Sequence, residues 1–364
     1  MKKHEKHAKL IKPEIGFYGR NEIAFLGAPC GIIKSLVDAC IESISGDIKI
    51  TYVDADHGSD ENVSFKNNIL QDKISHKRFE KKSFSTFDQK FLLSDQDMIL
   101  VNGNHFEAKS QIVIIDPKKE ESLKRRITQL TNVKAFVLSE GVDEVFGWLE
   151  KSPEIPLIKI SEIDKISNLF LSEIKYPVLK ALILTGGKST RMGADKSTLN
   201  YHGMPQHAYL KKTLDRLSLP TYISCREDQR NDFDNPITDK FVGLGPYGAI
   251  LSAFQEDPNA AWLVVACDLP LLKKPDFEYL VSNRNTKKMA TTCFNPETNF
   301  PDPLFTIWEP KVYQTLLSFL SIGYSCPRKV LINTDTEIIH LPRPEVLANV
   351  NTPGEKFEIE KYFS

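Results

Sequence analysis

An apolar run that ends in two glycines and continues into a basic loop constrains this chain more than any other feature. Leu182–Thr185 is followed by Gly186 and Gly187, and the loop beyond them carries Arg191 and Lys196. Glycine has no Cβ, so the backbone can turn sharply and approach a ligand closely. Backbone N–H groups and two cations predict a phosphate-binding loop at the end of a strand. The spacing is neither that of a P-loop nor that of the dinucleotide-binding G-x-G-x-x-G, and a plain surface turn is the alternative.

Length and charge narrow the class of protein. A chain of 364 residues is long for one hydrophobic core, and we expect two domains, residues 1–172 and 178–364. The formal net charge of −1 argues against nucleic acid or an anionic membrane as a partner. The basic N-terminus lacks the apolar stretch of a secretory signal, and no apolar run approaches the ~18 residues of a membrane span. Six cysteines without a C-x-x-C pair are typical of reduced thiols, so we expect a cytoplasmic protein.

Strands and helices alternate in both halves, which predicts α/β domains. In the second half the short strands are apolar throughout, and this indicates a parallel sheet covered by helices on both faces. The polar stretch Asp60–Asp88 predicts loops and a hairpin. The expected strands are residues 23–26, 48–53, 98–101, 111–115, 135–138, 181–184, 221–224, 261–266 and 289–293, and the expected helices are residues 33–44, 120–130, 206–217, 248–255 and 310–321.

Two carboxylates in the second half are candidates for metal and ligand binding. Asp268 follows the apolar strand Ala261–Ala266, and α/β sheets bind ligands at the carboxyl ends of their strands. Mg²⁺ commonly takes only one or two protein carboxylates and fills its octahedron with phosphate oxygens and water. Asp239 precedes Gly245–Gly248, a Gly-Pro-x-Gly turn that starts a helix whose N-terminal amides can face an anion. A turn or cap role for Asp268 and a solvated loop for Asp239 are the alternatives.

The glycine-rich loop resembles the signature L-x-G-G-x-x-x-R-M-G-x-D-K of the molybdenum cofactor guanylyltransferases, and it meets every fixed position of that pattern. The resemblance extends over Val178–Lys356, where Gly245–Gly248 is similar to the family's G-P-L-A-G and Asn349–Glu355 resembles its N-x-N-T-P-E-D tail. It implies a Rossmann-like three-layer α/β/α nucleotidyltransferase domain. It also implies that Leu184, Thr185, Gly186, Gly187, Lys196, Asp239 and Asp268 bind the nucleotide, that Lys196, Arg191 and Asp268 act in catalysis, and that Asp268 and Asp239 hold Mg²⁺.

The implied reaction transfers GMP from GTP to the terminal phosphate of molybdopterin and releases pyrophosphate. Because the acceptor phosphate is already an ionised nucleophile, the site needs positioning and charge neutralisation rather than a strong general base. Gly187 favours GTP over CTP, since cytidylyl relatives tend to carry L-A-A-G at this loop. Cys225 stands where members of the family can present an Asn to the base. Arg328 and Lys329 are candidates for a phosphate or pterin contact, or form a solvated basic pair.

Three alternatives to this function remain. A cytidylyltransferase or a sugar-phosphate nucleotidylyltransferase would use the same loop, and a non-catalytic molybdenum cofactor carrier would bind without reacting. The partners implied are GTP and molybdopterin and, among proteins, molybdoenzymes or other cofactor-biosynthesis proteins.

The first half contains the outline of a P-loop. In Gly27–Ser35, Lys34 and Ser35 stand as in G-K-[ST], but Ala28 and Ile33 occupy the positions of the two glycines. A β-branched residue cannot readily replace a glycine whose backbone closes on phosphate. Together with Asp54–His57, this loop resembles the molybdopterin-guanine dinucleotide adaptor protein and implies a P-loop-derived domain with a degenerate Walker A motif. The alternative is that Lys34 and Ser35 merely begin a helix.

Overall fold

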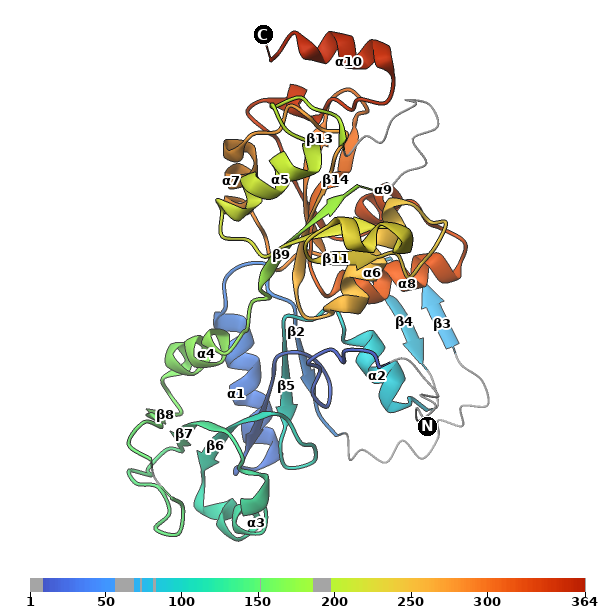
Figure 1. The fold of residues 1–364 in the computed structure, drawn as a ribbon. Coiled ribbons are helices and arrows are strands. Elements are labelled where there is room, and N and C mark those ends of the chain that lie inside the picture. The colour runs from blue at the N-terminus through green and yellow to red at the C-terminus, as the bar shows by residue number, and fades with distance from the viewer. Residues whose placement is uncertain are drawn as a thin grey trace, which may run out of the picture. The chain divides into compact units, whose positions relative to one another are not determined.

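The computed structural model describes residues 9–55, 69–72, 74–80, 83–150, 152–185 and 198–363. The chain folds as two compact units (Figure 1). The first comprises Glu14–Lys175, and the second comprises the chain from Tyr176 onward together with the described N-terminal residues up to Pro13. Both units are α/β domains, as the sequence predicts.

The first unit is built on a parallel six-stranded sheet of order β2-β5-β1-β6-β7-β8. Alternate residues of each strand enter opposite faces, so Phe25 packs beneath the helices while Leu26 joins a separate cluster on the other side. Phe25 meets Phe170 edge to face at 6.4 Å between ring centroids. The strands are β1 (Glu22–Leu26), β2 (Ile50–Val53), β5 (Met98–Asn102), β6 (Ser110–Ile115), β7 (Val133–Leu138) and β8 (Leu157–Lys159), and the two helices of the first face are α1 (Cys30–Ser43) and α4 (Ile163–Ser172).

The remaining elements of the first unit are short. The predicted hairpin is present as β3 (Ile69–Asp72) and β4 (Lys77–Glu80), followed by α2 (Thr86–Leu92). The sequence predicts one helix over residues 120–130, but the structure has two shorter elements there. After η1 (Pro117–Lys119), α3 (Glu120–Lys124) ends and η2 (Ile127–Gln129) follows, because Arg126 leaves helical geometry with φ −105° and ψ 15°.

The second unit contains a seven-stranded sheet of order β11-β10-β9-β12-β14-β13-β15, and this sheet is mixed rather than parallel. Strand β14 runs antiparallel to both of its neighbours because β13 and β14 form a hairpin, whose turn includes Asn299 at a φ of 58°. Pro301 and Pro303 conceal β14 in the sequence, since proline is rare inside sheets. The strands are β9 (Leu179–Leu184), β10 (Thr221–Cys225), β11 (Pro236–Thr238), β12 (Ala261–Ala266), β13 (Ala290–Asn295), β14 (Phe300–Trp308) and β15 (Thr336–Ile339).

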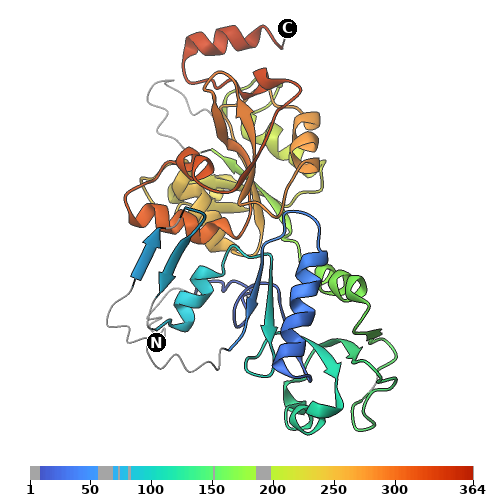
Figure 2. The same ribbon diagram turned by 180° about the vertical axis from the view of Figure 1, so that it is seen from behind.

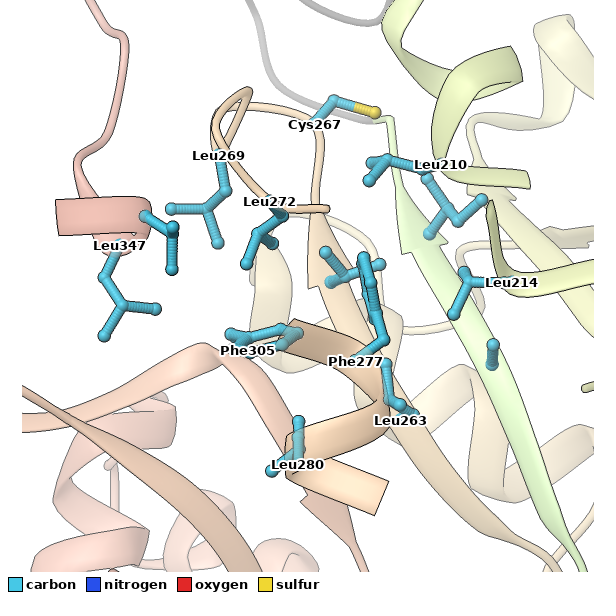
Figure 3. Close-up of a cluster of buried hydrophobic side chains, with 14 of the residues drawn as sticks. Leu210, Leu214, Leu263, Cys267, Leu269, Leu272, Phe277, Leu280, Phe305 and Leu347 are labelled. Carbon is cyan, nitrogen blue, oxygen red and sulfur yellow. The ribbon is translucent and has the colours of Figure 1, made fainter. Parts of the chain in front are cut away.

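Helices cover both faces of this sheet, so the three-layer α/β/α prediction is confirmed (Figure 2). Strand β12 sends Leu263 to one cluster, shown in Figure 3 with Phe277 and Leu280, and sends Trp262 to the other. The first cluster draws on α5 (Gln206–Asp215), α7 (Lys274–Ser282) and α10 (Pro353–Glu360), and the second on α6 (Pro246–Glu256), α8 (Val312–Ser321) and α9 (Pro327–Ile332). Since both faces are buried, the strand is apolar throughout, which is why the sequence shows no alternation. The described 3-10 segments of this unit include η4 (Glu227–Asp232) and η5 (Pro344–Leu347).

Candidate active site

The carboxyl ends of four parallel strands meet at one edge of the second sheet. Strands β9, β10, β11 and β12 run in the same direction, so the residues after each strand face the same side, where α/β folds bind ligands. Thr185 Oγ1 donates to the carbonyl oxygen of Ser224 at 2.6 Å, and the amide of Cys267 donates to that of Leu184 at 3.2 Å. These bonds hold the strand ends in register immediately before residues 186–197. Gly186, Gly187, Arg191 and Lys196 lie in that stretch, outside the described residues.

Asp239 is positioned by the neighbouring strand β10. Its amide donates to the carbonyl oxygen of Cys225 at 3.1 Å, and its Oδ1 accepts a hydrogen bond from Ser224 Oγ at 3.2 Å. Burial raises the pKa of the Asp239 carboxyl, and the bond from Ser224 partly opposes that rise. Burial of a carboxylate in its charged form costs folding free energy. Carboxylates that are kept at such a cost are typical of functional sites. Sequence reasoning missed the role of Ser224.

Asp268 follows β12 and is half buried. The backbone amide of Val350 donates to its carbonyl oxygen at 2.9 Å, which brings the Asn349–Glu355 segment to the same edge. Burial, together with the charges of Glu360 and Asp268, raises the pKa of the buried Tyr201 phenol to about 12.

The strand order separates Asp239 from Asp268. Asp239 follows β11 and Asp268 follows β12, and β10 and β9 lie between these two strands. At the usual spacing between neighbouring strands, the axes of β11 and β12 are about 14 Å apart. The strand order thus sets Asp239 and Asp268 at separate points along this edge.

The Gly-Pro-x-Gly turn begins helix α6, as predicted, with Pro246 as its first residue. Gly245 caps the helix at a φ of +56°, which a residue with a side chain rarely adopts. A Cβ on Gly248 would lie 2.3 Å from the carbonyl oxygen of Phe241, so only glycine allows the preceding loop to pass so close. The amide of Lys240 also donates to Ser252 Oγ at 2.8 Å. These contacts fix the loop that carries Asp239 against the helix N-terminus.

Cys225, which stands where the family can present an Asn, is fully buried at the end of β10. Burial and the charge of Asp239 raise the pKa of its thiol to about 11. The Cys225 side chain is therefore a neutral part of the core.

The edge continues past β12 to the start of β14. Because β14 is antiparallel, Asp302 lies level with the end of β12 and opposite Cys293. Asp302 is buried, and its oxygens accept from the amide of Leu304 at 2.9 Å and from Asn295 Nδ2 at 3.3 Å. Burial raises the pKa of this carboxyl, and the charge of Arg328 is among the influences that lower it. The Pro-Asp-Pro sequence was the available signal for this buried acid.

The side chains of Arg328 and Lys329 contact different neighbours. Arg328 lies over the ring of Phe300 at 5.8 Å and acts electrostatically on Asp302, so it belongs to the ligand edge. Lys329 lies over Tyr324 at 4.5 Å and is exposed. Of the two cations, Arg328 alone has charge that reaches the buried acid on β14.

The first unit does not retain the shape of a P-loop. Helix α1 begins at Cys30 rather than near Ile33, so Lys34 lies inside the helix, where it pairs with Asp38 at 2.5 Å. The loop between β1 and α1 consists only of Gly27, Ala28 and Pro29, so it is shorter than the loop of a complete Walker A motif. Asp56 and His57 lie outside the described residues.

Two general features of the described ranges bear on function. None of their helices is both long and apolar enough to cross a membrane. Within the same ranges, no three or more His, Cys, Asp or Glu side chains are grouped so as to hold a metal.

Comparisons with known proteins point to one family of domains. Residues 181–336 match the family model of the MobA-like NTP transferase domain. A molybdenum cofactor biosynthesis bifunctional protein from Synechocystis is 31% identical over 192 residues, which are 52% of this chain and 55% of that protein. A probable molybdenum cofactor guanylyltransferase from Carboxydothermus hydrogenoformans is 28% identical over 194 residues, 51% of this chain and 97% of that protein. The chain thus spans about half the length of the first relative and nearly all of the second.

One solved structure resembles the N-terminal half of the chain in its fold. The structure of MobB from Bacillus subtilis covers 43% of this chain and 98% of its own, with 8% sequence identity and a TM-score of 0.31.

Proposed function

Residues 181–336 form a MobA-like NTP transferase domain, and from this premise we propose that the chain transfers GMP from GTP to the terminal phosphate of molybdopterin. An oxygen of the acceptor phosphate attacks the α-phosphorus of GTP, the bond to the β-phosphate breaks, and pyrophosphate leaves. The names of the relatives support guanylyl transfer. The observation that carries the proposal is the placement of Asp239 and Asp268 at two separate points of one ligand edge.

We assign these two carboxylates to different parts of GTP. Asp239, held by Ser224 beside the N-terminus of α6, takes the nucleoside side. Asp268, at the end of β12, takes the phosphate side, where a carboxylate suits a divalent cation. Asp239 therefore serves the nucleotide rather than the same ion as Asp268, because two strands lie between β11 and β12.

The residues at this edge fit Mg²⁺. The described ranges offer no cluster of three or more metal-ligating side chains, and Mg²⁺ needs only one or two carboxylates when phosphates and water complete its shell. Asp268 would hold the ion, which when bound supplies charge neutralisation at the phosphates. The protein's own contribution is to fix the carboxylate at a rigid strand end.

Arg191 and Lys196 are proposed to neutralise the α-phosphate and the departing pyrophosphate, and Leu184, Thr185, Gly186 and Gly187 to hold the phosphates through the backbone. Substitution of Lys196 by Ala is then expected to lower turnover by orders of magnitude.

We place the acceptor on the side of β14. Arg328 supplies a cation there, and Asn349 directs a buried Oδ1 that accepts no hydrogen bond within the part of the chain that the structure describes. Val350 joins this segment to Asp268, so donor and acceptor sides meet at β12. A phosphate monoester that enters beside Arg328 would need no general base, since it is already ionised.

The test is the release of pyrophosphate by the purified chain with Mg²⁺, molybdopterin and each of GTP, CTP, ATP and UTP. Turnover with GTP alone supports the proposal in full. Turnover with CTP would keep the chemistry but reject the argument from Gly187. Absence of turnover with all four nucleotides, while GTP still binds, would favour the non-catalytic carrier.

A further inference from the structure

A cysteine and a histidine that the proposed function does not use lie together in the first unit. Cys30 Sγ is 3.2 Å from His105 Nε2. Cys30 is the first residue of α1, directly after the loop from β1, and His105 lies just beyond β5. Since β1 and β5 are adjacent and parallel, the two residues meet at the carboxyl edge of the first sheet, where a P-loop would otherwise bind phosphate.

The sulfur of Cys30 lies at a helix start and beside a polar side chain. The thiol stands at the N-terminus of a 14-residue helix, whose dipole stabilises an anion. Asn104 Nδ2 lies 3.7 Å from the sulfur and donates to the carbonyl oxygen of Ala28 at 2.8 Å. Asn104 is itself held, because its carbonyl oxygen accepts from Arg126 Nη2 at 2.8 Å. The amide donor and the imidazole thus approach the sulfur from a braced loop.

Charged groups of α1 and of the segment after β2 have partners of their own. Lys34, one turn along α1, is paired with Asp38. Asp54 accepts from the Tyr52 hydroxyl at 3.0 Å and from Asn102 Nδ2 at 2.7 Å. Burial, then Asp54, and then the charges of Cys30 and Asp38 raise the pKa of the Tyr52 phenol, so Tyr52 stays neutral beside the pair.

Two of the six cysteines are accessible, and they stand in different surroundings. Cys30 is half buried and Cys326 is exposed, whereas Cys40, Cys225, Cys267 and Cys293 are buried. Cys326 precedes the six-residue helix α9 and provides an internal reference for an ordinary accessible thiol.

We propose that Cys30 and His105 form a hydrogen-bonded thiol–imidazole pair that exchanges with low-molecular-weight disulfides. The Cys30 sulfur attacks one sulfur of the disulfide while His105 takes the proton of the thiol, and a mixed disulfide forms as the original S–S bond breaks. The imidazole passes that proton to the departing thiolate, which leaves as a thiol. No net oxidant beyond the disulfide itself is required.

The experiment treats the reduced full-length chain with glutathione disulfide between pH 6 and 9 and follows each cysteine by mass spectrometry. We expect Cys30 to react about tenfold or more faster than Cys326 at pH 6.5, because His105 stands ready to take its proton during the attack. In H105Q the rate at Cys30 should fall toward that of Cys326 and acquire the steep pH dependence of an ordinary thiol.

The rate at Cys326 in H105Q serves as the matched control, and the buried cysteines report unfolding. A second measurement with iodoacetamide, which alkylates thiolates without a leaving thiol, separates thiolate formation from disulfide recognition. Equal rates at Cys30 and Cys326, or an unchanged pH profile in folded H105Q, would overturn the proposal. Fast alkylation without exchange would also reject it, since the disulfide would then not be the reaction partner.

Discussion

The amide of Val350 donates a hydrogen bond to the carbonyl oxygen of Asp268 over 2.9 Å, which ties the C-terminal segment to the strand end that carries the candidate metal ligand. A few residues later, Glu355 Oε2 accepts from the amides of Asn351 at 2.6 Å and Thr352 at 3.1 Å, and Thr352 Oγ1 accepts from the amide of Glu355. This capping box starts α10. The short stretch from Val350 to Glu355 is therefore fixed at both of its ends.

Removal of that cap should loosen the segment without disturbing the sheet. We expect T352A to lose about 1 kcal/mol of local stability, because the N3 amide of α10 loses its acceptor. Hydrogen exchange should become faster at α10 and at the amide of Val350 and stay unchanged in β12. The control is S282A, which removes an exposed hydroxyl at the end of α7. Faster exchange throughout the second unit would contradict the local role.

Substitution of Asp268 should abolish transfer while leaving the fold intact. D268N keeps the shape of the side chain but removes the charge that a divalent cation requires, so turnover should fall by at least about a hundredfold. Pyrophosphate release at saturating Mg²⁺ and GTP measures the effect, and the melting temperature checks folding. D215N, an exposed carboxylate on α5 of the same unit, provides the control. Near-normal turnover in D268N would remove Asp268 from the site.

Substitution of Asp239 by Asn should weaken GTP binding and, at neutral pH, raise the stability of the fold. Burial raises its folded-state pKa, so its contribution to stability is present below the unfolded-state pKa and is lost as pH rises through the folded-state value. D239N should therefore melt at a higher temperature than the native chain at pH 7 to 8, and this gain should disappear as the pH falls to about 4. GTP binding should weaken at the same time. A lower melting temperature at pH 7 would mean that Ser224 and its surroundings stabilise the charged form after all.

The neighbouring cations Arg328 and Lys329 form a matched pair. R328A should raise the KM for the acceptor about tenfold or more, since a cation beside the ligand edge is lost, and should leave the KM for GTP unchanged. K329A should change neither constant appreciably, because Lys329 is directed to Tyr324. Steady-state kinetics with each substrate varied in turn distinguishes the two. Equal effects of R328A and K329A would mean that the acceptor responds only to the summed positive charge of the two residues, without a specific contact to Arg328.

A methyl group on Gly248 should disturb the loop that carries Asp239. The new Cβ would lie 2.3 Å from the carbonyl oxygen of Phe241, and that backbone has to move. We expect G248A to lower the melting temperature and to raise the KM for GTP, with kcat less affected. G354A is the control, since its Cβ would contact only Thr352 Oγ1 at 4.0 Å. An unaltered KM would show that the loop does not position the nucleotide.

The sequence predicts the individual strands well and their arrangement poorly. Ala261–Ala266 is found as β12 because buried strands are uniformly apolar. The turn at Gly245 predicts α6 because few residues can adopt its backbone conformation. Strand β14 escapes notice since its two prolines argue against a sheet.

The candidate site is less predictable, because it depends on which strands are neighbours. The bond from Ser224 to Asp239 exists only because β10 pairs with β11, and the separation of Asp239 from Asp268 follows from strand order. Sequence spacing gives neither relation. The roles of Arg191 and Lys196 stay predictions.

The reversed direction of β14 has a further consequence. In the proposed arrangement, strands β9 to β12 deliver the loops of the nucleotide side, whereas a hairpin turn, residues 296–299 between β13 and β14, borders the acceptor side. The loops and the turn come from separate stretches of chain. Exchange of the hairpin turn between homologous proteins is then expected to alter acceptor choice while donor choice is inherited unchanged.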